Sequence, residues 1–154
     1  MLYDPRHEEH LGRLEAQLRR ADAITSELMS QVIAQACARF GALGSAAKAR
    51  IDRLIESRAW TDATLALLEL ELPQWQLRRL IWEDGEWLCT LSKQPRLPLV
   101  LDEALEANHA VLSLAMLIAL VEARRTAAAG DTDTAATPSI RPTSGQVVCC
   151  DNFA

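Results

Sequence analysis

The fold of this chain is decided by residues 76–92, which read QLRRLIWEDGEWLCTLS. Asp84 and Gly85 separate two runs that are rich in apolar and aromatic residues. An Asp-Gly pair in this position is typical of a two-residue type I′ turn, because both central residues need a positive φ. The stretch is therefore predicted to form a β-hairpin, with Glu83 facing Glu86 as the hydrogen-bonded pair nearest the turn.

The hairpin register places Trp82 opposite Trp87, in the type of pair whose side chains come closest. Ile81 and Leu88 then lie on the other face of the hairpin. Apolar residues on both faces indicate that the hairpin is covered on two sides or gains a further strand, since an isolated hairpin is only marginally stable in water.

Patterns typical of helices occupy most of the remaining chain. Alanine and leucine are its most frequent residues, and both favour helices. Apolar residues recur three or four positions apart before the hairpin, and an apolar run follows it. Helices are predicted at residues 7–40 with a bend near 22–25, at 46–57, from 61 to Pro73, at 103–108 with Asp102 as N-cap, and at 109–125.

These elements define an α+β fold that is mostly helical, with about five helices packed around one β-hairpin at 76–92. A chain of 154 residues has room for one domain and a tail. Residues 1–125 are predicted to form that single domain. Threonine, alanine, glycine, aspartate and proline dominate the remainder, so residues 126–154 are predicted to be a disordered tail.

The N-terminal helix carries an apolar stripe of its own, formed by Leu11, Leu14 and Leu18. A helix over residues 7–40 is longer than so small a body can cover. An uncovered stripe of this kind is usually buried against a second copy of the chain. We therefore expect the three leucines to mediate self-association.

The charge balance argues against nucleic acid as a partner. The chain carries 21 acidic and 16 basic side chains, for a formal net charge of −5. A protein that binds the phosphate backbone needs a basic stripe, and the bases here are spread along the sequence.

The longest apolar run argues against a membrane protein. It extends from Ala110 to Val121 with one interruption at Ser113, which is about 18 Å of helix against a hydrocarbon core of about 30 Å. The first residues lead into charged positions where a signal peptide would be apolar. The four cysteines form no C-x-x-C pattern, which suits a reducing compartment. We expect a cytoplasmic protein.

No pattern of catalytic residues stands out. The sequence contains no Gly-rich phosphate loop, nucleophile elbow or spaced carboxylate dyad. Cys37 would need a histidine base, for which His109 is a distant candidate, and its apolar neighbours predict a small core residue instead. His7 and His10 lie three apart but have no third metal ligand at a recognisable spacing. We expect a protein that is not an enzyme and that has no cofactor.

Aromatic and basic residues interleave in the hairpin, where Arg78 and Arg79 precede the Trp82/Trp87 pair. An exposed pair of this kind could stack on nucleobases or clamp a peptide. A cross-strand tryptophan pair also anchors a small hairpin to helices. The acidic turn would repel phosphate, so we favour anchoring and keep these four residues as candidate binding residues.

The middle half of the chain contains the segments Ile51–Ile55, Trp60–Ala63, Leu70–Trp75, Asp84–Trp87 and Leu91-Ser92. Together these segments resemble a family of small uncharacterised bacterial proteins. The resemblance implies a bacterial cytosolic setting and no particular activity.

These observations lead to one hypothesis of function and one alternative. The first is a non-enzymatic protein-interaction module, whose partner is another protein or a second copy bound through the N-terminal helix. The alternative is a weak nucleic-acid or peptide binder that uses the Trp/Arg hairpin.

Overall fold

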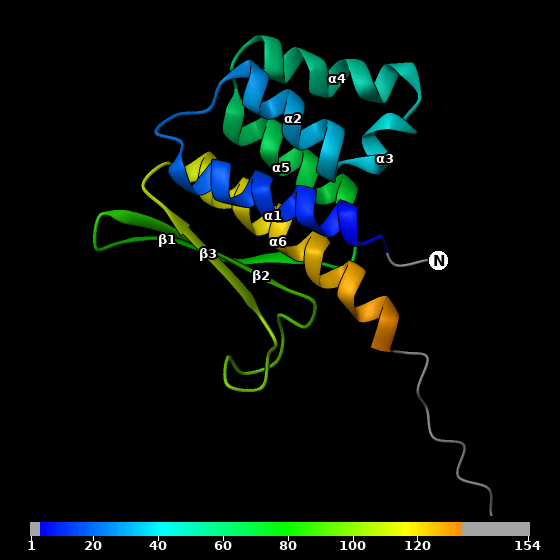
Figure 1. Ribbon diagram of the computed structural model, residues 1–154. Helices are drawn as coiled ribbons and strands as arrows, with labels where there is room; N and C mark the ends of the chain where they lie inside the picture. Colours follow the sequence, from blue (N-terminus) through cyan, green and yellow to red (C-terminus); the bar gives the residue numbers. More distant parts are fainter. Residues whose placement is uncertain (1–3, 134–154) are drawn as a thin grey trace, which may run out of the picture.

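The structure, a computed structural model, describes residues 4–133 and confirms an α+β fold that is mostly helical. The helices are α1 (Pro5–Arg20), α2 (Ser26–Ala36), α3 (Ala38–Gly41), α4 (Ser45–Glu56), α5 (Trp60–Glu71) and α6 (Leu112–Asp133). The strands are β1 (Gln76–Glu83), β2 (Glu86–Ser92) and β3 (Leu105–His109). The helices cover one face of the sheet, and α6 lies between the sheet and the other helices (Figure 1).

The strands form one antiparallel sheet in the order β1-β2-β3. The predicted hairpin is confirmed, because Trp82 pairs with Trp87 and Glu83 pairs with Glu86. Asp84 has a φ of 52°, and the φ of Gly85 is 84°, as a type I′ turn requires. The expectation that the hairpin gains cover or a further strand is met by β3, which lies beside β2.

The predicted helix at residues 103–108 is wrong, because most of this segment belongs to β3. Ala107 faces Cys89 across the sheet, and both side chains are buried. The side chains of this segment favour a helix, but the pairing with β2 and the burial it brings outweigh that local preference. Asp102 accordingly does not cap a helix.

The predicted helix over residues 7–40 consists of three helices. α1 ends at Arg20, and the next residue, Ala21, is extended. The Thr25 hydroxyl accepts a hydrogen bond from the Leu28 N–H at 3.1 Å, which starts α2. The break falls at the predicted bend, and it allows α2 to fold back beside α1 (Figure 1).

The expectation that the α1 leucines lack a partner within the chain is wrong. Leu11, Leu14 and Leu18 are 1%, 2% and 0% exposed in a single copy of the chain. The helix that covers them is α6, which packs along α1. Glu15 of α1 also accepts a hydrogen bond from Arg125 Nη1 of α6 at 2.5 Å. The stripe is therefore part of the core and is not available to a second copy.

The most apolar helix is α6, and it is the centre of the core. Residues Leu114 to Val121 are all completely buried, because sheet and helices surround this part of α6. α6 begins at Leu112 rather than residue 109, since β3 extends to His109. No helix in residues 4–133 combines the length and apolar character needed to cross a bilayer.

The boundary predicted for the C-terminal tail is too early. α6 continues to Asp133, so residues 126–133 are helical and not disordered. The prediction for residues 134–154 lies outside the described residues.

Candidate functional site

The two tryptophans of the hairpin have different surroundings. Their ring centroids are 5.4 Å apart with an interplanar angle of 62°, which is an edge-to-face contact. Trp87 packs against the core, as predicted. Trp82 is 55% exposed, so the prediction that it anchors the hairpin is wrong. The reason is that the end of the hairpin projects beyond the helical layer (Figure 1).

The strand that carries Trp82 is an edge of the sheet, because β1 pairs with β2 and with no other described strand. Backbone groups of successive residues in an antiparallel strand point alternately to its two sides. Glu83, Ile81 and Arg79 direct theirs toward β2, since Glu83 and Glu86 form the hydrogen-bonded pair next to the turn. Leu80 and Trp82 therefore present their N–H and C=O groups along the open edge.

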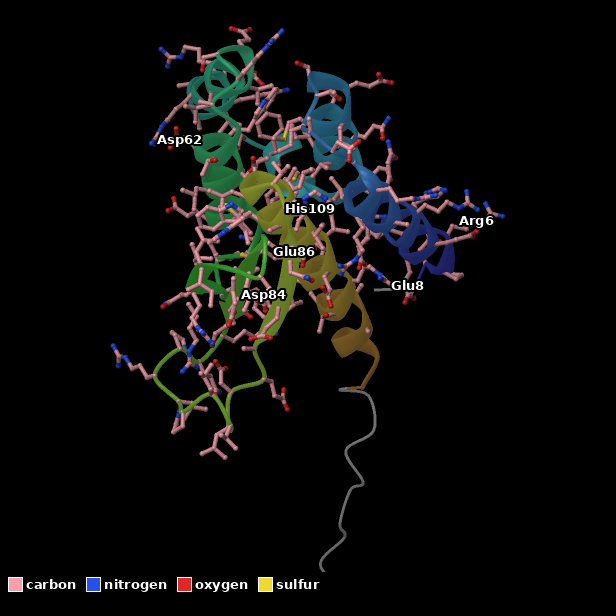
Figure 2. All side chains as sticks on the ribbon, turned by 90° about the vertical axis from the view of Figure 1, so that its left-hand side faces the viewer. Arg6, Glu8, Asp62, Asp84, Glu86 and His109 are labelled. Carbon is pink, nitrogen blue, oxygen red and sulfur yellow. The ribbon has the colours of Figure 1, made fainter. Side chains whose placement is uncertain are left out.

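The end of the hairpin is acidic. Glu83, Asp84 and Glu86 are all exposed there. Glu86 and His109 line one shallow pocket at this end of the sheet, and Figure 2 labels both residues together with Asp84. The Asn108 amide donates a hydrogen bond to the Glu86 carboxylate, while no described residue forms an ion pair with Glu83. Phosphate would be repelled by this group of carboxylates.

Arg78, one of the predicted binding residues, is engaged within the chain. Its guanidinium forms an ion pair with Asp102 and donates to the Leu97 carbonyl at 2.8 Å. The Ser92 hydroxyl donates to the same Asp102 carboxylate at 2.8 Å, and the Gln94 N–H donates to that hydroxyl at 3.0 Å. This polar network holds the loop between β2 and β3, so Arg78 is a structural residue. Sequence reasoning missed the network because it placed Asp102 at a helix start.

Arg79 has a different position. It faces Thr90 of β2, on the side of the sheet away from the helices, and it is half-buried. No hydrogen bond or ion pair joins its guanidinium to another residue in the range 4–133. Of the two predicted arginines, Arg79 is thus the one that remains free to meet a partner.

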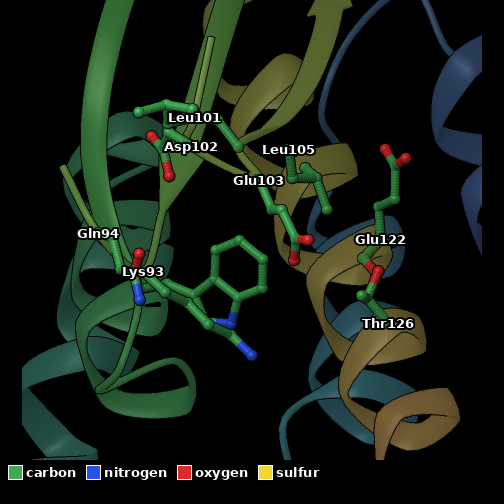
Figure 3. A pocket seen from close by; sticks show the side chains of 10 residues that line it. Lys93, Gln94, Leu101, Asp102, Glu103, Leu105, Glu122 and Thr126 are labelled. Atoms are coloured by element: carbon green, nitrogen blue, oxygen red, sulfur yellow. The ribbon is translucent and has the colours of Figure 1, made fainter. Parts of the chain in front are cut away.

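A cavity of about 600 Å³ lies between the loop before β3 and the second half of α6 (Figure 3). Trp75, Glu103 and Glu122 are among the residues that line it. An aromatic ring beside carboxylates suits a cation. The Lys93 ammonium already fills this role, since its nitrogen lies 5.0 Å from the centroid of the Trp75 ring.

The residues weighed as catalytic have structural roles. Cys37 is 3% exposed, and burial together with the charge of Glu71 raises the pKa of its thiol to about 12. The thiol is therefore protonated at neutral pH and a poor nucleophile. His109 Nδ1 accepts a hydrogen bond from the Val111 N–H at 2.9 Å, next to the start of α6. In the described part of the chain, no three His, Cys, Asp or Glu side chains gather where they could hold a metal.

No protein-family model, curated protein or solved structure matches the chain. The resemblance to small bacterial proteins therefore stays an expectation. On the described surface, the open edge of β1 combines unpaired backbone groups with the exposed indole of Trp82.

Proposed function

We propose that this protein is a non-enzymatic interaction module that binds another polypeptide along the open edge of β1. The observation that carries the proposal is the 55% exposure of Trp82 on a strand that has one unpaired edge. A large exposed indole is unfavourable in water, and tryptophan is enriched among the residues that dominate protein interfaces.

The backbone of β1 supports the same function. The unpaired N–H and C=O groups of Leu80 and Trp82 can bond to an extended segment of a partner, in the manner of strand addition. Main-chain bonds would supply attraction, while the Trp82 side chain would supply a specific apolar contact. Arg79 and Glu83, on the opposite face of β1, have opposite charges and would set the direction of the partner strand.

The alternative of a nucleic-acid binder has less support. Arg78 is held by Asp102, and the exposed acids of the turn lie next to Trp82. A single free arginine in such surroundings would not hold a phosphate backbone. A peptide that adds as a strand is compatible with the proposal.

The proposal includes a cytoplasmic location. Cys37 and Cys89 are free thiols in the described part of the chain, and both are buried. Free cysteines are common where glutathione and thioredoxin keep thiols reduced.

Site-directed photocrosslinking tests the proposal. A photoreactive benzoylphenylalanine is placed at position 82 of the full chain, and for comparison at position 62, where Asp62 is exposed on α5, far from the hairpin end. Irradiation in bacterial cells should give protein adducts from position 82 that position 62 does not give. Absence of such adducts, or adducts to nucleic acid instead, would contradict the proposal.

A further inference from the structure

The open edge of β1 has a pattern that identifies its occupant. Two copies of one strand can pair antiparallel about a two-fold axis, and each facing pair away from the axis then occurs twice. Main-chain bonds form only where outward-directed residues face one another. Between the irregularity at Leu77–Arg79 and the turn, these residues are Leu80 and Trp82, so this regular part of β1 offers few registers.

Three registers bring outward-directed residues together. When Leu80 faces its own copy, Arg79 faces Ile81 and Arg78 faces Trp82. When Trp82 faces its own copy, Glu83 faces Ile81. Each of these two registers places a charge against an apolar side chain.

In the third register, apolar residues face apolar residues and opposite charges face each other. Leu80 faces Trp82 of the second copy, Ile81 faces its own copy on the axis, and Arg79 faces Glu83. The two Arg79–Glu83 pairs fall at positions without main-chain bonds, where Cα atoms are about 4.5 Å apart and side chains are closest. The Leu80–Trp82 pairs lie on the opposite face and cover the exposed indole.

The unpaired charges in a single copy of the chain also favour the third register. Glu83 lies directly opposite Glu86 across the hairpin, and like charges in that position destabilise a sheet. Glu86 has Asn108 as a partner, whereas Glu83 has no ion-pair partner in residues 4–133. Arg79 is likewise unpaired. In the third register each of these two residues obtains the opposite charge.

We infer that the occupant of the β1 edge is a second copy of this chain, paired antiparallel about Ile81 to give a continuous six-stranded sheet. The inference rests on the proposed function, because it names the partner of the same edge. It replaces the N-terminal leucines, which are buried, as the route to self-association.

Charge reversal in the full chain tests this register. Wild type should sediment as a dimer at high micromolar concentration. The variants R79E and E83R should each raise the dimer dissociation constant about tenfold or more, because each brings like charges together twice. R13E makes the same change of charge as R79E on an exposed part of α1 and should leave the dimer intact.

Mixing provides the decisive measurement. R79E carries acids at positions 79 and 83, and E83R carries bases at both positions. An equimolar mixture of the two variants should therefore form a heterodimer. The double variant R79E/E83R should recover the homodimer. Circular dichroism of each variant checks that the fold is retained.

Three results would overturn the inference: a monomeric wild type, a dimer that R79E and E83R leave unchanged, or a mixture that stays monomeric. A monomeric wild type that still crosslinks to another protein from position 82 would refute the second copy and leave the proposed function standing. Loss of both the dimer and the crosslink would refute both.

Discussion

Replacing Asp102 by alanine should destabilise the domain strongly. Its side chain is 2% exposed, and that of its partner Arg78 is 16% exposed. Removing one member of a buried ion pair leaves the other charge uncompensated, which costs about 3–5 kcal/mol. We expect about 3 kcal/mol, at the lower end of that range, because Arg78 keeps its bond to the Leu97 carbonyl and some contact with water.

Urea unfolding followed by circular dichroism measures this loss. With an m-value near 2 kcal/mol/M, a loss of about 3 kcal/mol lowers the midpoint by about 1.5 M. R13A is the matched control, because Arg13 and Glu9 form an ion pair whose side chains are 71% and 60% exposed. Such surface pairs contribute about 0–1 kcal/mol, so the R13A midpoint should barely move.

A second variant separates the charge from the packing. Replacing both partners by apolar residues, R78M/D102L, removes the unpaired charge and should recover much of the stability lost in D102A. If D102A unfolds within about 0.5 kcal/mol of R13A, the scale set by surface pairs, then the polar network does not hold the loop and the structural role given to Arg78 is wrong.

Three further outcomes follow from the structure. Leu14→Ala should cost about 2–5 kcal/mol in urea unfolding without changing the sedimentation of the folded protein, because Leu14 is buried inside one copy. Gly85→Ala should lower the melting temperature, because the φ of +84° at this position strains any residue with a Cβ. Gly41→Ala should not lower it, because Gly41 lies in a helix and a Cβ there meets no other atom within 4 Å. Burial raises the pKa of Cys37 from an ordinary 9.0 to about 12. The thiol of the unfolded chain therefore ionises before that of the folded chain, so the free energy of unfolding should hold below pH 9 and decrease as the pH rises toward 12. This decrease should be less steep in C37A. An unchanged pH profile in C37A would contradict that assignment.

The parts of the fold that sequence reasoning predicted correctly are those set by neighbours in the chain. Asp84 and Gly85 specify their turn almost alone, and the turn then fixes the register of Trp82 and Trp87. β3 could not be predicted in this way. Its residues favour a helix, and its strand pairing depends on β2, a segment that only the folded chain brings beside it.

The candidate site shows the same division. The sequence predicts that Trp82 and Trp87 face each other. Both lie on the same face of one hairpin, so their neighbours in the chain do not determine which of the two side chains the helices cover. That depends on where the helical layer ends relative to the hairpin (Figure 1). The burial of the α1 leucines cannot be predicted locally for the same reason, because the helix that covers them, α6, lies at the other end of the described chain.

The two adjacent arginines differ because of an irregularity in β1. The pairing register shifts between Leu77 and Arg79, which is where one extra residue is inserted. Leu77 faces Leu91 and Leu80 faces Cys89, so two residues three positions apart share the face toward the helices, which strict alternation forbids. The inserted residue is Arg78, and it leaves the alternation to reach the loop before β3.

This insertion accounts for the division of roles along the strand. Arg78 is turned toward Asp102 and fixes the loop, while alternation resumes at Arg79 and places it on the same face as Glu83, with Ile81 between them. When two copies of β1 pair antiparallel about Ile81, Arg79 of one copy lies opposite Glu83 of the other. The bulge therefore removes Arg78 from the regular part of β1, and ordinary alternation after it places Arg79 and Glu83 at the spacing that the proposed pairing with a second copy requires.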